Sequence, residues 1–355
     1  MKRGQRFAAL MAACALVMAA LGAAGAAVSS VVFTPGTSAV SADTLGLGPA
    51  PHLTAVPLSY TRPASIPVLV YHQLDDGCKP TAAECDAKEA ESSSEEQFAV
   101  EMGWLYQHGY RTITAAQYTK WLRGQPVALP ARPVLITVDN GIENFFEAGT
   151  GVLQRYGFTA TAMIVTGFAD GAGGRCTTDQ PGCPAANEGW DATWAQLAAL
   201  PAGTWNFALE AGPSGHYVQG YSKTCPVYLT CLEPGETVAH YEQRAVAELN
   251  TGEAELRHHL RGRADADVWT VPYSDLGYPR CAQSSCTPQP SIGPPGWLAA
   301  YAAKRFSGVF VEDAYRNGTQ HERFRLDIQG WMTPGEFAAL FGSGLKHGDF
   351  QGAGS

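Results

Sequence analysis

Apolar and polar positions follow two periods that alternate along the chain from residue 66 to about residue 341. Short continuous apolar runs predict buried strands of the kind found in parallel sheets. These runs occupy residues 66–71, 133–138, 159–165, 205–209, 268–271 and 309–311. Between the runs, apolar residues recur at helical spacing, which predicts amphipathic helices. Strands separated by helices indicate βαβ units, and therefore a parallel sheet.

Three of the predicted helices begin with a capping signal, a Ser or Thr followed three residues later by Gln. The pairs are Ser94 with Gln97, Thr114 with Gln117, and Thr193 with Gln196. Further helices are expected over residues 143–156, 235–260, 297–306 and 333–341. In a parallel barrel, catalytic side chains lie at the carboxyl ends of the strands. The strand ends to inspect are residues 71–72, 139–141, 210–216 and 272–273.

The N-terminal region differs in character from the rest of the chain. Three basic residues precede an uncharged apolar run over residues 7–28, which is typical of an export signal and is long enough to cross a bilayer. We expect residues 1–30 to be a signal peptide or signal anchor, with the rest of the chain outside the cell in either case. The length of the run favours a retained helix. Residues 31–62 have the composition of a linker.

These boundaries leave one large domain over residues 63–345 and a flexible tail over residues 346–355. The chain has 355 residues, of which 45% are apolar and 16% charged, and this composition excludes a disordered chain. Its 24 Lys and Arg are outnumbered by 33 Asp and Glu, for a net charge of −9. No basic stripe is visible, which argues against a nucleic-acid or anionic-membrane surface. Membrane contact is therefore expected only through the N-terminal helix, and the oligomeric state stays open.

Eight of the nine cysteines form four closely spaced pairs in the sequence, while Cys14 lies in the apolar run. The pairs are Cys78 with Cys85, Cys176 with Cys183, Cys225 with Cys231, and Cys281 with Cys286. An even set in an exported chain predicts disulfides, each pinning one local loop. A zinc site would favour Cys-x2-Cys knuckles, and the sequence has none.

Two ordered segments carry a family resemblance. Residues 66–72, Ile-Pro-Val-Leu-Val-Tyr-His, are followed by residues 133–141, Pro-Val-Leu-Ile-Thr-Val-Asp-Asn-Gly. With the segments near residues 156–161, 193–197 and 323–337, they resemble the polysaccharide deacetylases, the NodB-homology type of carbohydrate esterase. The resemblance covers about residues 64–342 and implies an α/β fold, a distorted (β/α)7 barrel. It also implies hydrolysis of acetyl groups, the C–N amide bonds of N-acetyl sugars, on an extracellular or cell-envelope glycan.

The resemblance also implies roles for individual residues. In that family one Asp is the general base, while a second Asp and two histidines hold a divalent metal, often zinc, that polarises the acetyl group. Asp139 stands at the base position, and Asn140 stands where the metal-binding Asp is expected. Aligning His216 with the second histidine puts Gly212 at the first. The third motif retains Tyr273 as a catalytic candidate but has no Arg.

The expected metal ligands are thus reduced to Asn140 and His216, with Glu210 as a possible substitute carboxylate. Two main hypotheses follow. The chain is either a hydrolase that uses zinc or a similar divalent metal, or a degenerate homologue that binds glycan without cleaving it and needs no cofactor. A purely structural role in the cell wall is a third. Structural alternatives also exist for the residues: Asn140 in a turn, Glu210 as a strand-end acid and His216 in an exposed loop.

Overall fold

The computed structural model describes residues 48–75, 92–169, 191–214, 229, 236–274, 297–311 and 322–342. All of them belong to one compact unit, Pro35–Ser355. Within these ranges no helix is long and apolar enough to cross a membrane. The apolar run at residues 7–28 lies outside them, so the N-terminal anchor stays a prediction. The same holds for the predicted disulfides of Cys78, Cys85, Cys176, Cys183, Cys225, Cys231, Cys281 and Cys286.

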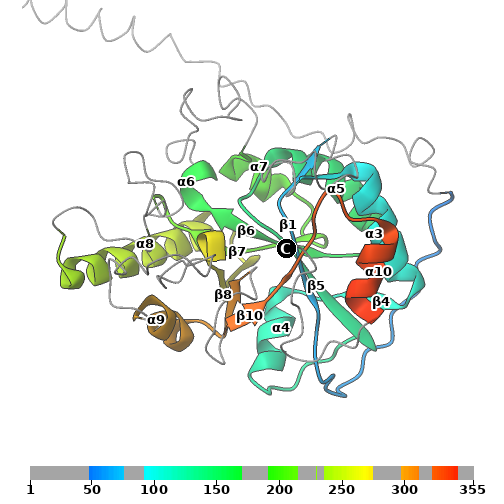
Figure 1. Ribbon diagram of the computed structural model, residues 1–355, viewed down its shortest axis with the longest axis horizontal. Helices are drawn as coiled ribbons and strands as arrows, with labels where there is room; N and C mark the ends of the chain where they lie inside the picture. The colour runs from blue at the N-terminus through cyan, green and yellow to red at the C-terminus, as the bar shows by residue number, and fades with distance from the viewer. Residues whose placement is uncertain are drawn as a thin grey trace, which may run out of the picture. The chain divides into compact units, whose positions relative to one another are not determined.

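A nine-stranded parallel sheet forms the centre of the described fold (Figure 1). Its order is β10 (Glu322–Phe324), β9 (Gly308–Val311), β8 (Ala264–Thr270), β7 (Trp205–Ala211), β6 (Ala160–Val165), β5 (Arg132–Val138), β1 (Val68–Tyr71) and β11 (Leu326–Asp327). The short strand β4 (Tyr110–Thr112) also pairs with β5. Strands β2 (Gln73–Asp75) and β3 (Ser92–Ser94) form a separate pair. The predicted parallel sheet is confirmed.

The two edges of this sheet are joined by a single residue. Strand β10 pairs with β9 at one edge and β11 pairs with β1 at the other, yet only Arg325 separates β10 from β11 in the chain. The sheet therefore curls, and the segment Glu322–Asp327 spans from edge to edge as in a barrel. The predicted barrel of about seven strands is confirmed: β1, β5, β6, β7, β8 and β9 form it with a closing strand that divides at Arg325 into β10 and β11, and β4 pairs with β5 outside this path.

Helices follow most of the strands. They are α3 (Glu95–Gln107), α4 (Ala115–Leu122), α5 (Glu143–Arg155), α6 (Thr166–Ala169), α7 (Trp194–Ala199), α8 (Val238–His259), α9 (Trp297–Arg305) and α10 (Pro334–Gly342). Complete capping boxes begin α4 at Thr114 and α7 at Thr193, as predicted. At α3, Ser94 accepts a hydrogen bond from the Gln97 backbone, but the Gln97 side chain bonds Glu101 instead.

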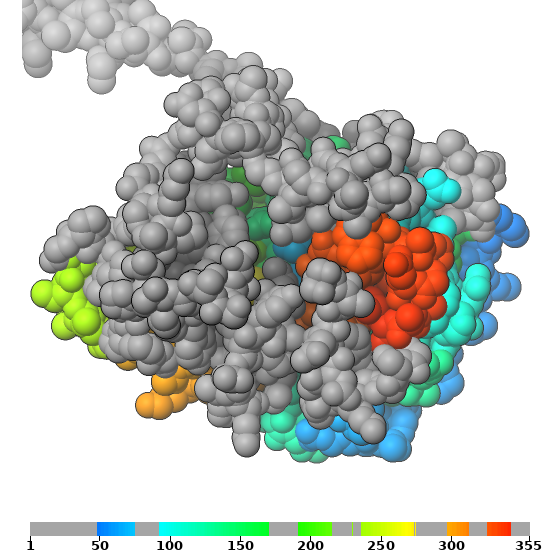
Figure 2. All heavy atoms as spheres, in the orientation of Figure 1, coloured from blue at the N-terminus to red at the C-terminus, as the bar shows by residue number. Residues whose placement is uncertain are grey.

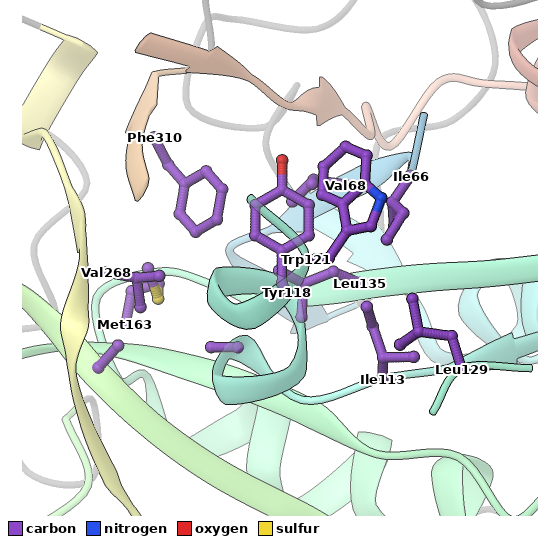
Figure 3. Packing of buried hydrophobic residues seen from close by; sticks show 12 residues of the cluster. Ile66, Val68, Ile113, Tyr118, Trp121, Leu129, Leu135, Met163, Val268 and Phe310 are labelled. Carbon is purple, nitrogen blue, oxygen red and sulfur yellow. The ribbon is translucent and has the colours of Figure 1, made fainter. Parts of the chain in front are cut away.

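Apolar side chains fill the amino-terminal part of the barrel. Tyr118 and Trp121 of α4 pack against inward-facing residues of six strands (Figure 3). These residues are Val68, Leu135, Met163, Ala208, Val268 and Phe310. Because strand side chains alternate in direction, Thr137 and Asp139 face inward like Leu135, and Glu210 faces inward like Ala208. The apolar amino-terminal filling thus gives way to polar groups at the carboxyl end, where a barrel carries its chemistry.

Residues 48–62, part of the predicted linker, lie against the domain, and we call this segment the strap. Ser59 and Leu129 form an antiparallel bridge, with both N–H···O distances at 2.9 Å. Arg155, at the end of α5, donates to the carbonyl oxygen of Gly48. Just after the strap, Trp121 Nε1 donates to the carbonyl oxygen of Pro63 at 3.0 Å. The strap therefore runs along the amino-terminal end of the sheet.

Candidate active site

The carboxyl ends of β1 and β5 lie side by side. Tyr71 pairs with Val138, and the backbone N–H of Asp139 donates to the carbonyl oxygen of Tyr71 at 2.9 Å. The next residues, His72 and Asp139, are both buried, with 7% and 2% of their surfaces exposed. The two segments that carried the family resemblance thus meet at one point of the barrel.

Asp139 is held by a guanidinium group. Arg325 donates from Nη1 to Oδ1 and from Nη2 to Oδ2 of Asp139, both at 2.6 Å. Arg325 Nη1 also donates to Thr137 Oγ1 at 3.1 Å, and Thr137 Oγ1 donates to the carbonyl oxygen of Leu69. The ion pair is almost entirely removed from solvent. Such a two-point pairing favours the ionised carboxylate and fixes the plane in which it lies.

A left-handed turn follows Asp139. Asn140 has a φ of 70° and Gly141 a φ of 87°. Asn and Gly are the residues that adopt this region most readily, which gives a backbone reason for Asn at this position. The Asn140 amide oxygen is buried and makes no hydrogen bond with the described residues, so it does not close an Asx turn. The left-handed backbone therefore accounts for Asn at position 140, although its side chain closes no Asx turn. Its buried amide oxygen remains available to a hydrogen-bond donor or a cation.

Glu210 lies on the other side of this turn. Its Oε2 accepts the backbone N–H of Asn140 at 2.7 Å, and its carbonyl oxygen accepts Trp269 Nε1 at 2.7 Å. The register of β7 shifts against both neighbouring strands near this position, a feature often found beside active sites. Glu210 is 3% exposed. It orients the turn, and the structure thus brings together three of the candidate site residues, Asp139, Asn140 and Glu210.

Asp191 is a further acidic group beside the turn. Ile142 and Asp191 form an antiparallel bridge, and the N–H of Ala192 donates to the carbonyl oxygen of Gly141 at 3.0 Å. Burial raises the pKa of Asp191 to about 7. Its Oδ1 is buried without a hydrogen-bond partner among the described residues. Sequence reasoning missed Asp191, because only its contact with the turn distinguishes it from the other acids.

Gly212 occupies a position with no room for a side chain. A Cβ there would lie 2.8 Å from Glu248 Oε1, and closer still to the Glu248 carbonyl oxygen of α8. Gly252 of α8 packs against the same spot, where an added Cβ would lie 2.9 Å from the Gly212 Cα. Close strand–helix packing therefore explains the glycine. A histidine at this position is sterically excluded.

The remaining predicted site residues are only partly placed. Tyr273 lies in the short 3-10 helix η1 (Pro272–Ser274) that follows β8, so its backbone is at the carboxyl end of the sheet as expected. Its side chain lies outside the described part of the structure, as does all of His216. Their predicted catalytic and metal-binding roles stay predictions.

The described residues do not by themselves fit a three-ligand metal centre. No cluster of three His, Cys, Asp or Glu suited to a metal occurs in the described ranges. Both oxygens of Asp139 are bound by Arg325, and Glu210 Oε2 is bound by the turn backbone. The buried acceptors of the turn without a hydrogen-bond partner among the described residues are Asn140 Oδ1, which carries no charge, and Asp191 Oδ1. We therefore derive no chemical step through a metal.

Arg325 is the main site residue that sequence reasoning missed. The family pattern places an Arg in the third motif, where this chain has Thr270, so the motif alone indicates no arginine at the site. The structure supplies a guanidinium from the closing segment instead. A signal existed in the sequence: Arg325 lies inside Arg-Phe-Arg-Leu-Asp-Ile, and a charge within a predicted strand requires a partner.

Comparison with known proteins gives polysaccharide deacetylases as relatives. The Bacillus subtilis protein YxkH, which carries a provisional polysaccharide deacetylase name, is 30% identical over 104 residues, 29% of this chain and 33% of YxkH. The poly-β-1,6-N-acetyl-D-glucosamine N-deacetylase of Escherichia coli K12 is 26% identical over 196 residues, 52% of this chain and 27% of that protein. These relatives are polysaccharide deacetylases by name, and they support a NodB-like deacetylase family for this chain. No family model matches it.

Comparison of the fold with solved structures also finds a de-N-acetylase. The solved structure of a de-N-acetylase from Aggregatibacter actinomycetemcomitans superposes with a TM-score of 0.57 at 15% identity. The match covers 77% of this chain and 98% of that one. At this identity the likeness concerns the fold, and it supports the predicted NodB-like (β/α) barrel. The chain spans about a third or less of the length of the curated relatives that it matches.

Proposed function

We propose that this chain is a hydrolase that removes acetyl groups from the N-acetyl sugars of an extracellular or cell-envelope glycan. The observation that carries the proposal is the carboxyl group of Asp139, both oxygens of which are bound by Arg325 at the carboxyl end of β5. Family membership and the names of the relatives support the same activity. The export signal expected over residues 1–30 supports a location outside the cell, where such glycans lie.

The chemistry follows from the state in which Asp139 is held. Each carboxylate oxygen has two lone pairs, and the pairing with Arg325 uses one on each oxygen. The remaining lone pairs can accept a proton from a water molecule as that water attacks the acetyl carbonyl carbon. Collapse of the tetrahedral intermediate breaks the C–N bond, the sugar nitrogen takes up the proton that Asp139 accepted from the water, and acetate leaves. The guanidinium holds Asp139 in one orientation through both steps.

Acetate release tests the proposal. We would use the compact unit Pro35–Ser355, prepared with its cysteines oxidised, on β-1,6- and β-1,4-linked N-acetylglucosamine oligomers. Parallel samples receive zinc, cobalt or a chelator. We expect acetate release that Asp139→Asn removes, since the amide oxygen is a far weaker base. Activity of Asp139→Asn equal to that of the natural chain would refute the assignment of Asp139.

A second candidate function is glycan binding without hydrolysis. The observation that favours it is Gly212, where packing against α8 leaves no space for the first histidine of the family pattern. This candidate predicts oligomer binding by calorimetry with no acetate release under any metal condition. It also predicts that Asp139→Asn leaves the binding constant unchanged.

A further inference from the structure

Basic side chains gather at one end of the barrel. Of the Lys and Arg residues in the described ranges, all but Arg244, Arg323 and Arg325 lie near the amino-terminal end of the sheet. They occupy the strap, the starts of β4 and β5, and the last turns of α4, α5, α8 and α9 with the loops that follow. They are Arg62, Arg111, Lys120, Arg123, Arg132, Arg155, Arg257, Arg261, Arg263, Lys304 and Arg305. We call this set, together with the strap, the basic end.

Several acidic side chains lie toward the opposite end, whereas Asp265 and Asp267 at the start of β8, and Glu253 in the last third of α8, lie at or near the basic end. The first turns of α3, α5 and α10 carry Glu95, Glu96, Glu143 and Glu336, and the candidate site carries Asp139 and Glu210. The four glutamates in first turns suit the dipoles of their own helices. Because all the crossovers run in the same direction, these local preferences add up to a molecule with an acidic end and a basic end. The net charge of −9 conceals the local excess of cations at the basic end.

Several charges of the basic end are available to a partner. Arg123 pairs with Asp267, and both Arg257 and Arg305 pair with Glu253. In contrast, Arg62, Lys120, Arg261 and Lys304 are exposed. None of these four makes an ion pair with a residue of the described ranges. They come from four different segments, so the charge is spread over the whole end.

Exposed apolar side chains lie on the same end. The strap leaves Leu53, Val56, Leu58 and Tyr60 exposed by 47%, 39%, 58% and 76%. In the described ranges the only other large apolar side chain of this kind is Val238, at the start of α8. In Figure 2 α4 (cyan-green) and α9 (orange) show along the lower side of the molecule, and the blue segment that contains the strap runs down the right side to the same lower side. Cations interspersed with exposed Leu and Tyr are the composition of surfaces that bind at a lipid interface.

We propose that the basic end docks on an anionic membrane surface, with Leu58 and Tyr60 entering the headgroup layer. Charge complementarity selects this occupant, because anionic headgroups attract clustered Lys and Arg while neutral ones do not. Chain order agrees, since the apolar run at residues 7–28 lies about 20 residues before the strap. Docking at the amino-terminal end turns the carboxyl ends of the strands, and with them Asp139, away from the lipid. This goes beyond the proposed function and does not depend on it.

Vesicle co-sedimentation tests the proposal on the unit Pro35–Ser355, which lacks the apolar run and keeps every described strand and helix. We expect binding to vesicles with 30% phosphatidylglycerol in phosphatidylcholine, loss of binding at 1 M salt, and no binding to phosphatidylcholine alone. The variant Lys120→Gln/Arg261→Gln/Lys304→Gln should bind more weakly, by about fivefold for each charge removed. The variant Leu58→Ser/Tyr60→Ser should also bind more weakly.

Two controls separate the basic end from general effects. Val238→Ser removes an exposed apolar side chain far from the strap and should bind like the natural unit. Adding Glu96→Gln, Glu147→Gln and Glu242→Gln to the cation variant restores the net charge and should not restore binding. Restored binding, or equal binding to neutral and anionic vesicles, overturns the proposal. So does binding to an anionic wall polymer with no binding to vesicles.

Discussion

Arg325 and Asp139 join the closure of the barrel to its candidate base. Arg325 is the residue between β10 and β11, where the chain passes from one edge of the sheet to the other. Its side chain reaches β5 and binds both oxygens of Asp139 at 2.6 Å. The orientation of the carboxylate therefore depends on the same segment that closes the sheet.

We predict that Arg325→Lys lowers both activity and stability. Lysine keeps the charge but presents one donor centre, so it cannot bind both carboxylate oxygens in a plane. We expect kcat for acetate release to fall at least tenfold with KM nearly unchanged, because a positioning residue acts on the base and not on the substrate. Arg325→Gln leaves Asp139 as an unpaired buried charge and should cost about 3–5 kcal/mol of unfolding free energy.

The double variant Asp139→Asn/Arg325→Gln supplies the control. It removes both charges, so it should regain much of the stability that Arg325→Gln loses while staying inactive. Thermal melting and acetate release measure the two properties separately. Full kcat in Arg325→Lys would show that the two-point pairing has no part in positioning the base.

Much of this fold could be predicted from the sequence, because strand runs and capping residues are local signals. The strands that carry Asp139 and Glu210 lie where the apolar runs indicated, and Thr114 and Thr193 begin their helices. Asp139 and Asn140 were predicted from their place in the segment that resembles the family pattern, and Glu210 as the acid that follows a recognisable strand.

The rest depends on contacts between segments that are distant in the chain. Arg325 is 186 residues from Asp139, and no local pattern indicates their pairing. The strap has the composition of a linker, yet Ser59 bridges to Leu129. The basic end is likewise invisible in the chain, since its residues are gathered only when the crossovers bring the helix ends together.

We predict that Gly212→Ala destabilises the fold. The added Cβ would lie 2.8 Å from Glu248 Oε1 and nearer to the backbone of α8, which cannot move away cheaply. Overpacking of this kind typically costs about 1–3 kcal/mol. Thermal or denaturant unfolding measures the loss. Gly212→His should be worse and should not create a zinc site, even together with Asn140→Asp.

Gly151 provides a matched control for this prediction. It lies in α5, and a Cβ added there meets nothing within 4 Å. Gly151→Ala should therefore stabilise the fold by about 0.5–1 kcal/mol through helix propensity. If Gly212→Ala were as stable as Gly151→Ala, the proposed steric exclusion of a ligand at residue 212 would be wrong.

We predict that Asp191 makes the fold less stable as the pH rises toward 7. Burial raises its pKa from 3.8 to about 7, so the folded state keeps a proton that the unfolded chain releases at lower pH. Stability from this group is thus complete below about pH 4 and falls as the pH rises through the folded-state pKa. Asp191→Asn is neutral at every pH. Its melting temperature should therefore fall less than that of the natural chain between pH 5 and pH 8.

The backbone bridge to Ile142 gives this prediction a local readout. Amide exchange at residues 140–142 should speed up between pH 6 and pH 8, after correction for the intrinsic pH dependence, in the natural chain. It should not do so in Asp191→Asn. If the corrected exchange rates depended on pH in the same way in both proteins, Asp191 would have no part in the stability of the turn.

Glu101 provides a second buried carboxyl, away from the candidate base. Its Oε2 accepts the Tyr71 hydroxyl at 2.7 Å, and its Oε1 accepts Gln97 Nε2 at 2.9 Å. Gln97 Nε2 also donates to the carbonyl oxygen of Gln329 at 3.0 Å. This network connects β1 and α3 to the segment that follows β11. Burial raises the pKa of Glu101 to about 7, although both hydrogen bonds act to lower it.

We predict that Glu101→Gln removes a further part of the pH dependence of stability. The folded state holds the proton up to about pH 7, while the unfolded chain releases it near pH 4.5. The unfolding free energy therefore falls by about 3 kcal/mol between these two pH values, at 1.36 kcal/mol per pH unit. Above about pH 7 this contribution no longer changes with pH. Glu101→Gln should lack this fall in urea unfolding measured from pH 4.5 to pH 8.

Tyr71→Phe tests the cause of the shift as well as its sign. The phenylalanine ring can keep the packing with Phe98 and Phe145, and only the hydroxyl is lost. Without that donor the ionised carboxylate loses a stabilising partner, so the pKa of Glu101 should rise further. The fall in unfolding free energy should then extend to higher pH than in the natural chain. A fall that shifts to lower pH would contradict the role assigned to the Tyr71 hydroxyl, and a fall that persists in Glu101→Gln would assign the titration to another group.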